Sequence, residues 1–505
     1  MTELSLARIR SEGDAMMQAL SREYYESGAG IKSSAELQPI YARHAGIVND
    51  DALALVREDF RQAPEGSEER RASRLLLEWE AEAHVSRALA PLDEREIAWE
   101  ATAVATLDDG RQVPYQQLSI DIANAADRRE RLLLERGRAR LVATELAPLK
   151  REHFQREKDL VEALEIAPTY NDTFTALSGV DLIALATACR VFLRETQAMW
   201  DDVVKERVRT KLGIPLSEAT RADALALLRA PEFDSAFPAE SMEREIRLQA
   251  SEMGIDPTAK GRIILDTGER EGKRARAFCA PVRVPEEVYL VLRPHGGQQD
   301  WRTLLHELGH SLHFGYTAGD LPFEYRWLGD NSVTEGYAML FDHLMHDAGW
   351  LGRYTGVGAR EMAVFRRALG FEELQFLRRY TAKLIYETAL YGGSVSWDDL
   401  PALYVDTLSG ATSFRYDPAD AFVDVDPRFY SARYLRAWQL QAVLREGLRE
   451  RFDSDWFRNP RAGPWVVEQL FAHGQRELGG ELALRVTGQS LSFTPLVREV
   501  EAMLR

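Results

Sequence analysis

Apolar residues recur at helical spacing through most of the first half of the chain. Apolar residues recur at this spacing in stretches such as Leu75–Trp79 and Leu182–Cys189, and the segments around them are rich in charged residues. Breakers rich in glycine, proline or aspartate, such as Asp108-Asp109-Gly110, separate these stretches. The pattern predicts long amphipathic helices joined by short turns, which form a helical lobe over residues 1–245.

The pattern changes between residues 260 and 295, where short β-rich runs are broken by glycine and proline. These runs predict a small β-sheet, and they are Ile263–Leu265, Val282–Val284 and Val288–Leu292. Helical spacing returns at Trp301 and continues, with interruptions, to the end of the chain. We therefore expect a second lobe over residues 246–505. The expected fold is mainly α, with two helical lobes around a central cleft and a small sheet beside the helix that starts near Trp301.

That helix contains the pattern His-Glu-x-x-His. Residues four apart lie on one face of a helix, so His306 and His310 can direct both imidazoles at one metal ion. Glu307 reaches the same place and can accept a proton from a water molecule at the metal. Asp300 is the expected N-cap of this helix. The alternative is a buried helix whose two histidines are satisfied by hydrogen bonds, and the acid between them argues against it.

A catalytic zinc ion usually has three protein ligands, so the pattern requires one more. The class that continues as H-E-x-x-H-x-x-G-x-x-H is excluded, because His313 and Tyr316 stand where its glycine and last histidine would be. The third ligand should then be a carboxylate from a later helix, and the candidates are Glu324, Asp330 and Glu335. For Glu335 the alternative is a capping box with Ser332, in which the glutamate only accepts a backbone N–H.

Composition narrows the possible partners. The chain has 505 residues, with 63 Lys and Arg against 80 Asp and Glu, and a net charge of −17. That charge argues against binding of nucleic acid or of an anionic membrane. No apolar run reaches the length of a membrane span, and no signal peptide is evident. The two cysteines, Cys189 and Cys279, are too few for a disulfide framework, so we expect a cytoplasmic protein. The sequence carries no signal for an oligomeric state.

The segment Thr303–His313 resembles the zinc-binding motif of the thimet oligopeptidase and oligoendopeptidase F family of peptidases, including its trailing histidine. The interval of 25 residues from His310 to Glu335 matches that family's spacing to a glutamate ligand. The resemblance implies one zinc ion bound by His306, His310 and Glu335, with Glu307 as the general base. It also suggests that an edge strand before the helix pairs with the substrate backbone, although a purely structural hairpin is an alternative.

A second resemblance lies in Tyr430–Tyr434, which is similar to the tyrosine-rich segment of the same family. Arg433-Tyr434 also resembles a segment of angiotensin-converting enzyme. The resemblance implies that Tyr434 donates its hydroxyl hydrogen to the oxyanion, with Tyr430 as a substrate contact. The histidine that precedes the family's tyrosines is absent here, and the nearby residues are Asp424, Asp426 and Arg428.

Together these residues predict a zinc-dependent oligopeptidase, which hydrolyses short peptides with a metal-activated water and a glutamate base. A zinc-dependent carboxypeptidase or dipeptidyl carboxypeptidase is the first alternative, because the motif leaves the position of the cut open. A zinc-binding scaffold or binding protein with little hydrolytic activity is the second, because of the missing histidine.

Overall fold

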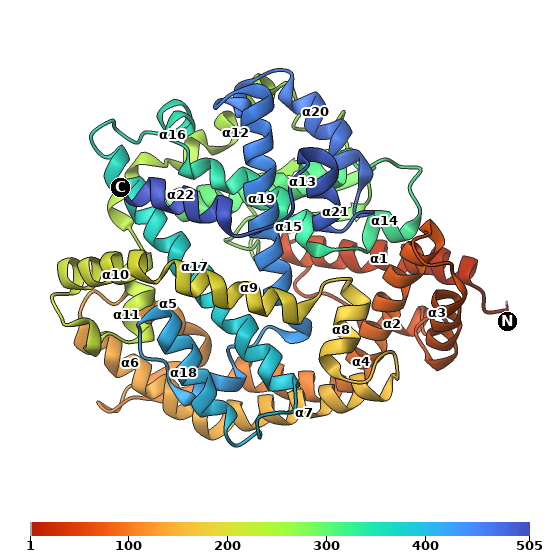
Figure 1. Cartoon of the computed structure of the whole chain (residues 1–505), viewed down its shortest axis with the longest axis horizontal. Helices are drawn as coiled ribbons and strands as arrows, with labels where there is room; N and C mark the ends of the chain where they lie inside the picture. Colours follow the sequence, from red (N-terminus) through yellow and green to blue (C-terminus); the bar gives the residue numbers. More distant parts are fainter. Residues whose placement is uncertain (1–2) are drawn as a thin grey trace. The chain divides into compact units, whose positions relative to one another are not determined.

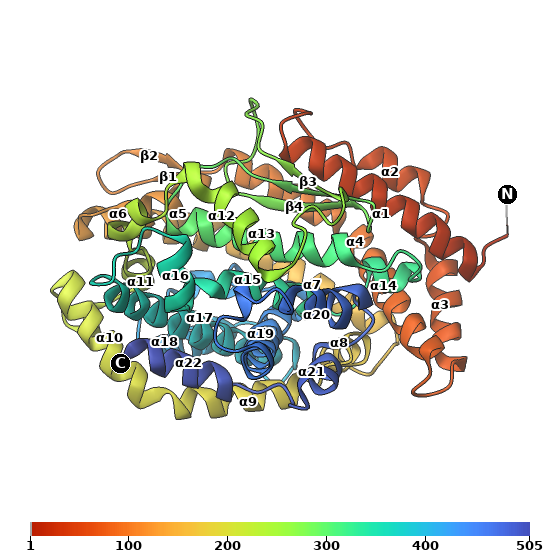
Figure 2. The ribbon, with the colours of Figure 1, turned by 90° about the horizontal axis from the view of Figure 1, so that it is seen from above.

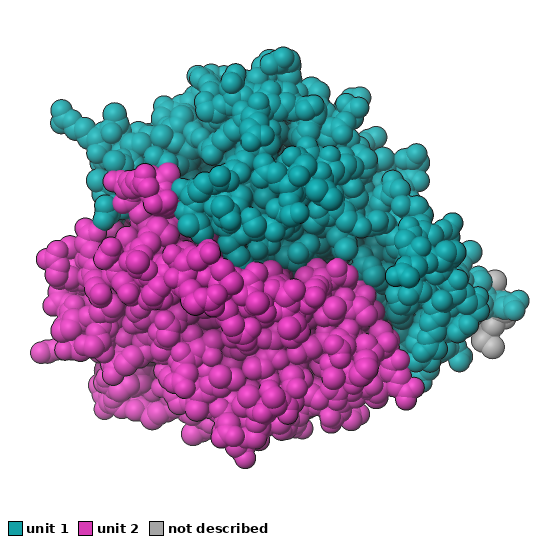
Figure 3. All heavy atoms as spheres, viewed as in Figure 1, with its two compact units in different colours: residues 1–80, 231–367, 433–499 teal, residues 81–230, 368–432, 500–505 magenta. Residues whose placement is uncertain are grey.

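The computed structural model describes residues 3–505, which divide into two compact units. Unit 1 comprises residues 3–80, 231–367 and 433–499, and unit 2 comprises residues 81–230, 368–432 and 500–505 (Figure 3). Each unit is therefore assembled from separate stretches of the chain, whereas the sequence pattern predicted two consecutive lobes. The division after residue 245 and the cleft stay predictions.

Helices account for most of the described chain, which confirms the predicted mainly α fold (Figure 1). The first twelve are α1 (Leu6–Gly28), α2 (Gln38–Arg43), α3 (Asp50–Gln62), α4 (Glu68–Thr102), α5 (Tyr115–Asn124), α6 (Arg128–Leu141), α7 (Ala147–Ala163), α8 (Tyr170–Ser178), α9 (Leu182–Glu195), α10 (Gln197–Leu212), α11 (Arg221–Leu228) and α12 (Met242–Met253). The others are α13 (Gln298–Tyr316), α14 (Phe323–Trp327), α15 (Asn331–Asp342), α16 (Ala348–Tyr354), α17 (Met362–Tyr391), α18 (Leu400–Thr412), α19 (Tyr430–Phe452), α20 (Ala462–Gln469), α21 (Gly479–Thr487) and α22 (Thr494–Leu504).

The predicted small sheet lies in unit 1 and directly precedes α13. Its strands are β3 (Ile263–Asp266), β4 (Phe278–Arg283) and β5 (Glu287–Val291), in the order β3-β5-β4. Strand β3 runs parallel to β5, and β4 runs antiparallel to β5. Both α1 and α13 pack against β4, so this edge strand is held between two helices (Figure 2).

A second sheet was not predicted. It is a hairpin in unit 2, formed by β1 (Val104–Thr106) and β2 (Gln112–Pro114). The turn between them contains Asp108-Asp109-Gly110, which the sequence marked only as a breaker, and Gly110 adopts a φ of 85° there. Strands of three residues are too short to establish an alternating pattern, so the sequence predicts only a short turn between helices here.

Helix α13, which carries His306 and His310, packs on α15, which carries Glu335 (Figure 1). Gly309 makes the close approach possible, because a Cβ atom at this position would lie 2.6 Å from Cα of Ala338 and 2.7 Å from the carbonyl oxygen of Tyr337. The sequence prediction for the start of α13 is wrong in one detail: Gly297 is the N-cap, and Asp300 lies in the first turn. Asp300 instead accepts hydrogen bonds from the backbone N–H groups of His295 and Gly296.

No single helix among residues 3–505 is both long and apolar enough to span a membrane. Helices α8 and α9 reach that length and apolarity only together, and they are bent by 95° where they meet.

Candidate metal centre

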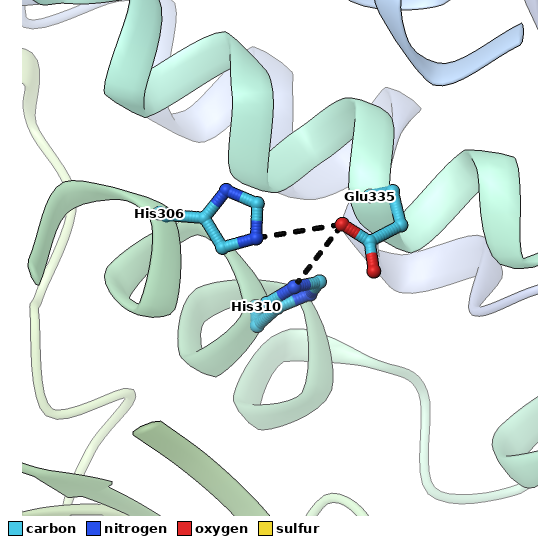
Figure 4. A group of neighbouring side chains, drawn as sticks. All are labelled: His306, His310 and Glu335. Carbon is cyan, nitrogen blue, oxygen red and sulfur yellow. Dashed lines mark ion pairs between the residues drawn. The ribbon is translucent and has the colours of Figure 1, made fainter. Parts of the chain in front are cut away.

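Three side chains converge where α13 packs on α15. His306 and His310 lie one turn apart on α13, with ring centroids 4.9 Å apart and an interplanar angle of 83°. Glu335 reaches them from α15 (Figure 4). Its Oε2 atom lies 3.4 Å from Nε2 of His306 and 3.8 Å from Nε2 of His310.

This spacing suits a tetrahedral zinc ion. Ligand atoms at about 2.0–2.1 Å from such an ion are about 3.4 Å from one another. The potential ligand atoms of His306, His310 and Glu335 all lie within 4.8 Å of one another. Two imidazole nitrogens and one carboxylate oxygen also form a donor set that zinc prefers, and three ligands leave a fourth position for water or substrate. The residues therefore fit a single zinc ion.

Partners on α15 orient both imidazoles. Oδ2 of the buried Asp342 lies 2.9 Å from Nδ1 of His306, and Oγ1 of Thr334 lies 2.9 Å from Nδ1 of His310. Hydrogen bonds at Nδ1 select the tautomers that present Nε2 as the ligand atom. His313 also approaches Oγ1 of Thr334, at 3.2 Å. The Thr334 hydroxyl can accept a hydrogen bond from Nδ1–H of His310 and donate its own hydrogen to Nδ1 of His313, so both contacts can form at once.

Burial and neighbouring charges act differently on the two histidines. Burial lowers the pKa of His310 to about 4, so this imidazole is neutral at pH 7. Burial opposes the cationic form of His306 as well, but hydrogen bonds and charges from Asp342 and Glu335 outweigh it and raise the pKa of His306 to about 10. Without a metal, the imidazole of His306 is therefore cationic at pH 7, with both ring nitrogens protonated. A metal ion must displace the proton on its ligand nitrogen.

Glu307 lies beside these residues and contacts the sheet. Its Oε2 atom accepts a hydrogen bond of 2.9 Å from the backbone N–H of Cys279 in β4. Burial raises the pKa of Glu307, and this effect is larger than the opposing ones of His306 and the Cys279 N–H. A carboxylate with a raised pKa is a stronger base, as the proposed role in proton transfer requires.

The other candidate ligands are engaged elsewhere. Glu324 is buried and accepts a hydrogen bond of 2.6 Å from Nε of Arg10. Asp330 is the N-cap of α15 and accepts from the backbone N–H groups of Ser332 and Gly479. Because Asp330 occupies the cap position, Ser332 lies inside the helix, and the capping box considered for Glu335 is not formed.

The predicted tyrosines lie at the start of α19, and both are partly buried. The ring of Tyr434 lies 6.3 Å from that of Trp438. The roles of Tyr434 in oxyanion stabilisation and of Tyr430 in substrate binding stay predictions. Arg428, near the position of the missing histidine, donates hydrogen bonds to Glu157 at 2.9 Å and to Ser86 at 2.8 Å, within unit 2.

Sequence reasoning missed Asp342 and Thr334. Asp342 follows Glu335 by seven residues, or about two helical turns, and so lies on the same face of α15. An acidic residue at that spacing in an otherwise apolar helix was the available signal. Thr334 gave no comparable signal, because one threonine at a helix start has many ordinary roles.

No protein-family model matches this chain, and no curated protein matches it in sequence. Solved structures do match. A carboxypeptidase from Pyrococcus furiosus has a TM-score of 0.65 and 13% identity, with 100% of both chains covered. A Bacillus anthracis protein assigned as an oligoendopeptidase F has the same TM-score and identity, with 98% of this chain and 88% of that chain covered. The chain therefore shares the fold of these two proteins, which is the oligoendopeptidase-like fold that its sequence resemblance predicted.

Proposed function

We propose that this protein is a zinc-dependent peptidase that hydrolyses short peptides. The observation that carries the proposal is the convergence of His306, His310 and Glu335, with Glu307 beside them, at spacings that suit one zinc ion. The shared fold supports it, because both matching structures bear the names of peptidases. Zinc is proposed as the resident metal because of the donor set.

A zinc ion at this site would polarise the scissile carbonyl and make water a stronger nucleophile near neutral pH. The chain's own residues supply the proton chemistry. Glu307 accepts a proton from the attacking water and passes it to the leaving amine. The Cys279 N–H holds one oxygen of Glu307, which leaves the other oxygen to exchange the proton. Tyr434 is the proposed hydrogen-bond donor to the developing oxyanion.

The first experiment replaces the proposed base. Glu307→Gln keeps the size of the side chain and removes its basicity, so zinc content should be retained while kcat falls by roughly 100-fold or more. Glu286→Gln is a matched control, because Glu286 is an exposed glutamate of the same unit. Near-normal peptide cleavage by Glu307→Gln would exclude Glu307 as the base.

The second experiment identifies the reaction. The purified protein is incubated with a mixture of short peptides, with and without a metal chelator, and products are analysed by mass spectrometry. Internal cuts that disappear with chelator indicate an oligoendopeptidase, and stepwise loss of C-terminal residues indicates a carboxypeptidase, which the Pyrococcus match makes the specific alternative. Zinc binding without cleavage of any peptide would instead assign the protein to the scaffold class.

A further inference from the structure

A cavity of about 560 Å³ in unit 2 is lined by four arginines. They are Arg136 and Arg140 on α6, Arg221 at the start of α11, and Arg415 just after α18. Two acidic residues, Glu135 and Asp417, also line it, so the lining residues carry an excess of two positive charges, which Asp108 beside Arg136 and Arg140 reduces to one. This excess stands out in a chain whose net charge is −17.

The backbone holds two of these arginines next to each other. Thr220 and Arg415 form an isolated parallel β-bridge. The backbone N–H of Arg221 donates to the carbonyl of Arg415 at 2.9 Å, and the N–H of Arg415 donates to the carbonyl of Ala219 at 3.0 Å. The bridge brings two cationic side chains together although they are 194 residues apart in sequence.

The guanidinium group of Arg415 has no carboxylate partner among residues 3–505. Its one hydrogen bond is from Nη2 to the carbonyl of Glu218, at 3.4 Å. A guanidinium group has five N–H donors, so most of those of Arg415 remain available to a ligand.

Arg221 is also incompletely paired. Its nitrogens lie 3.5 Å from Glu135 and 4.0 Å from Asp420. Both carboxylates are already bound by Arg138, with distances of 2.9 and 3.0 Å to Glu135 and of 2.8 and 2.7 Å to Asp420. The acids near Arg221 are therefore shared with a second cation, which leaves its charge only partly compensated.

Arg136 and Arg140 complete the cavity from α6. They are one turn apart and both pair with Asp108, at 3.0 and 2.7 Å. Because a single carboxylate serves two guanidinium groups, this side of the cavity also keeps excess positive charge. Tyr416, Leu132 and Ala139 add apolar surface to the lining.

From this geometry we propose that the cavity is a binding site for a phosphate group. Planar guanidinium forks match the oxygens of a tetrahedral dianion, and paired charge-assisted hydrogen bonds are the stronger ones in proteins. The ligand is either inorganic phosphate or the phosphate of a small organic ester. This site does not depend on the proposed peptidase activity, because none of its residues belongs to the metal centre.

The test measures binding of inorganic phosphate and of adenosine monophosphate to the full chain by titration calorimetry at low ionic strength. Arg415→Gln should weaken binding by about tenfold or more, because it removes a bidentate charged contact. Arg415→Lys should restore only part of the affinity, since it keeps the charge but loses the fork. Arg498→Gln is the control, because Arg498 is an exposed arginine of unit 1.

Arg136→Gln guards against a folding artefact, because the side chain of Arg136 is 56% exposed and its loss should not unfold the protein. It should weaken binding severalfold. Tighter binding of adenosine monophosphate than of phosphate supports an ester ligand, and equal affinity supports free phosphate. Absence of binding by both probes would overturn the proposal. So would binding that Arg415→Gln and Arg136→Gln leave unchanged, because phosphate would then be bound elsewhere, for instance at a metal ion.

Discussion

Asp342→Asn tests how the metal centre is organised. Asp342 is buried, and its two oxygens contact Nδ1 of His306, at 2.9 Å, and Nδ1 of His343. The substitution keeps the shape of the side chain and removes its charge. Carboxylates that orient a metal-bound histidine typically contribute 10- to 100-fold in metal affinity, or about 1.4–2.7 kcal/mol.

At neutral pH, the proton that metal-free His306 carries partly offsets this loss of zinc affinity. In the metal-free protein, burial disfavours the His306 cation, but Asp342 and Glu335 overcome that effect and raise the pKa of His306 to about 10. Displacing that proton at pH 7 costs about 4 kcal/mol, from three pH units at about 1.36 kcal/mol each. Removing the charge of Asp342 lowers the pKa of His306, so the variant needs less energy to lose the proton.

The two effects have different pH dependences, which makes the prediction specific. Wild-type zinc affinity should rise by up to about tenfold per pH unit above pH 7, because His306 stays protonated up to about pH 10 without metal. The zinc affinity of Asp342→Asn should rise less steeply with pH. The difference in zinc affinity between wild type and variant should therefore be small near pH 6.5 and largest at pH 8.5. Zinc affinity is measured by competition with a chelator across this range.

Calorimetry in buffers of different ionisation enthalpy gives the number of protons released on zinc binding. Wild type should release about one proton from His306 at pH 7, and Asp342→Asn should release fewer. Asp320→Asn is the matched control, because Asp320 is exposed in the same unit. Equal zinc affinities for wild type and Asp342→Asn at pH 8.5 would refute the reasoning that Asp342 orients a ligand.

Three further substitutions address the same helices. Glu335→Ala should reduce zinc binding by at least about tenfold as measured by metal analysis after dialysis, and unchanged zinc content would exclude Glu335 as a ligand. Thr334→Val should weaken zinc binding about tenfold, because His310 loses the acceptor of its Nδ1–H, whereas Thr334→Ser should preserve it. Gly309→Ala should lower the free energy of unfolding by more than about 3 kcal/mol, because the added Cβ meets the backbone of Ala338 at 2.6 Å. Denaturant unfolding measures this change. A decrease below about 1 kcal/mol would mean that the two helices separate easily.

Local patterns predicted the parts of this molecule that depend on local chemistry. His306 and His310 share one face of any helix that contains them, so their proximity could be predicted from the sequence. The small sheet before that helix could also be predicted, because its short strands are rich in β-branched residues. The predicted bounds of the strands were less accurate. For example, β4 begins at Phe278 rather than at Val282. Asp342 could not be assigned a role, since its role depends on how α15 packs against α13 rather than on its neighbours in sequence.

The sheet contacts the candidate metal centre, and this contact limits how an edge strand could pair with a substrate backbone. Strand β4 is an edge of the three-stranded sheet, and the outward N–H of Cys279 already donates to Glu307. Residues two apart point to the same edge of a strand, and the next outward residue is Pro281, which has no N–H. A peptide lying along these residues can therefore gain only their carbonyl acceptors, and it must supply the N–H donors itself. The hydrogen bond from Cys279 restrains the orientation of Glu307, and we expect any pairing of a substrate with β4 to occur around that hydrogen bond.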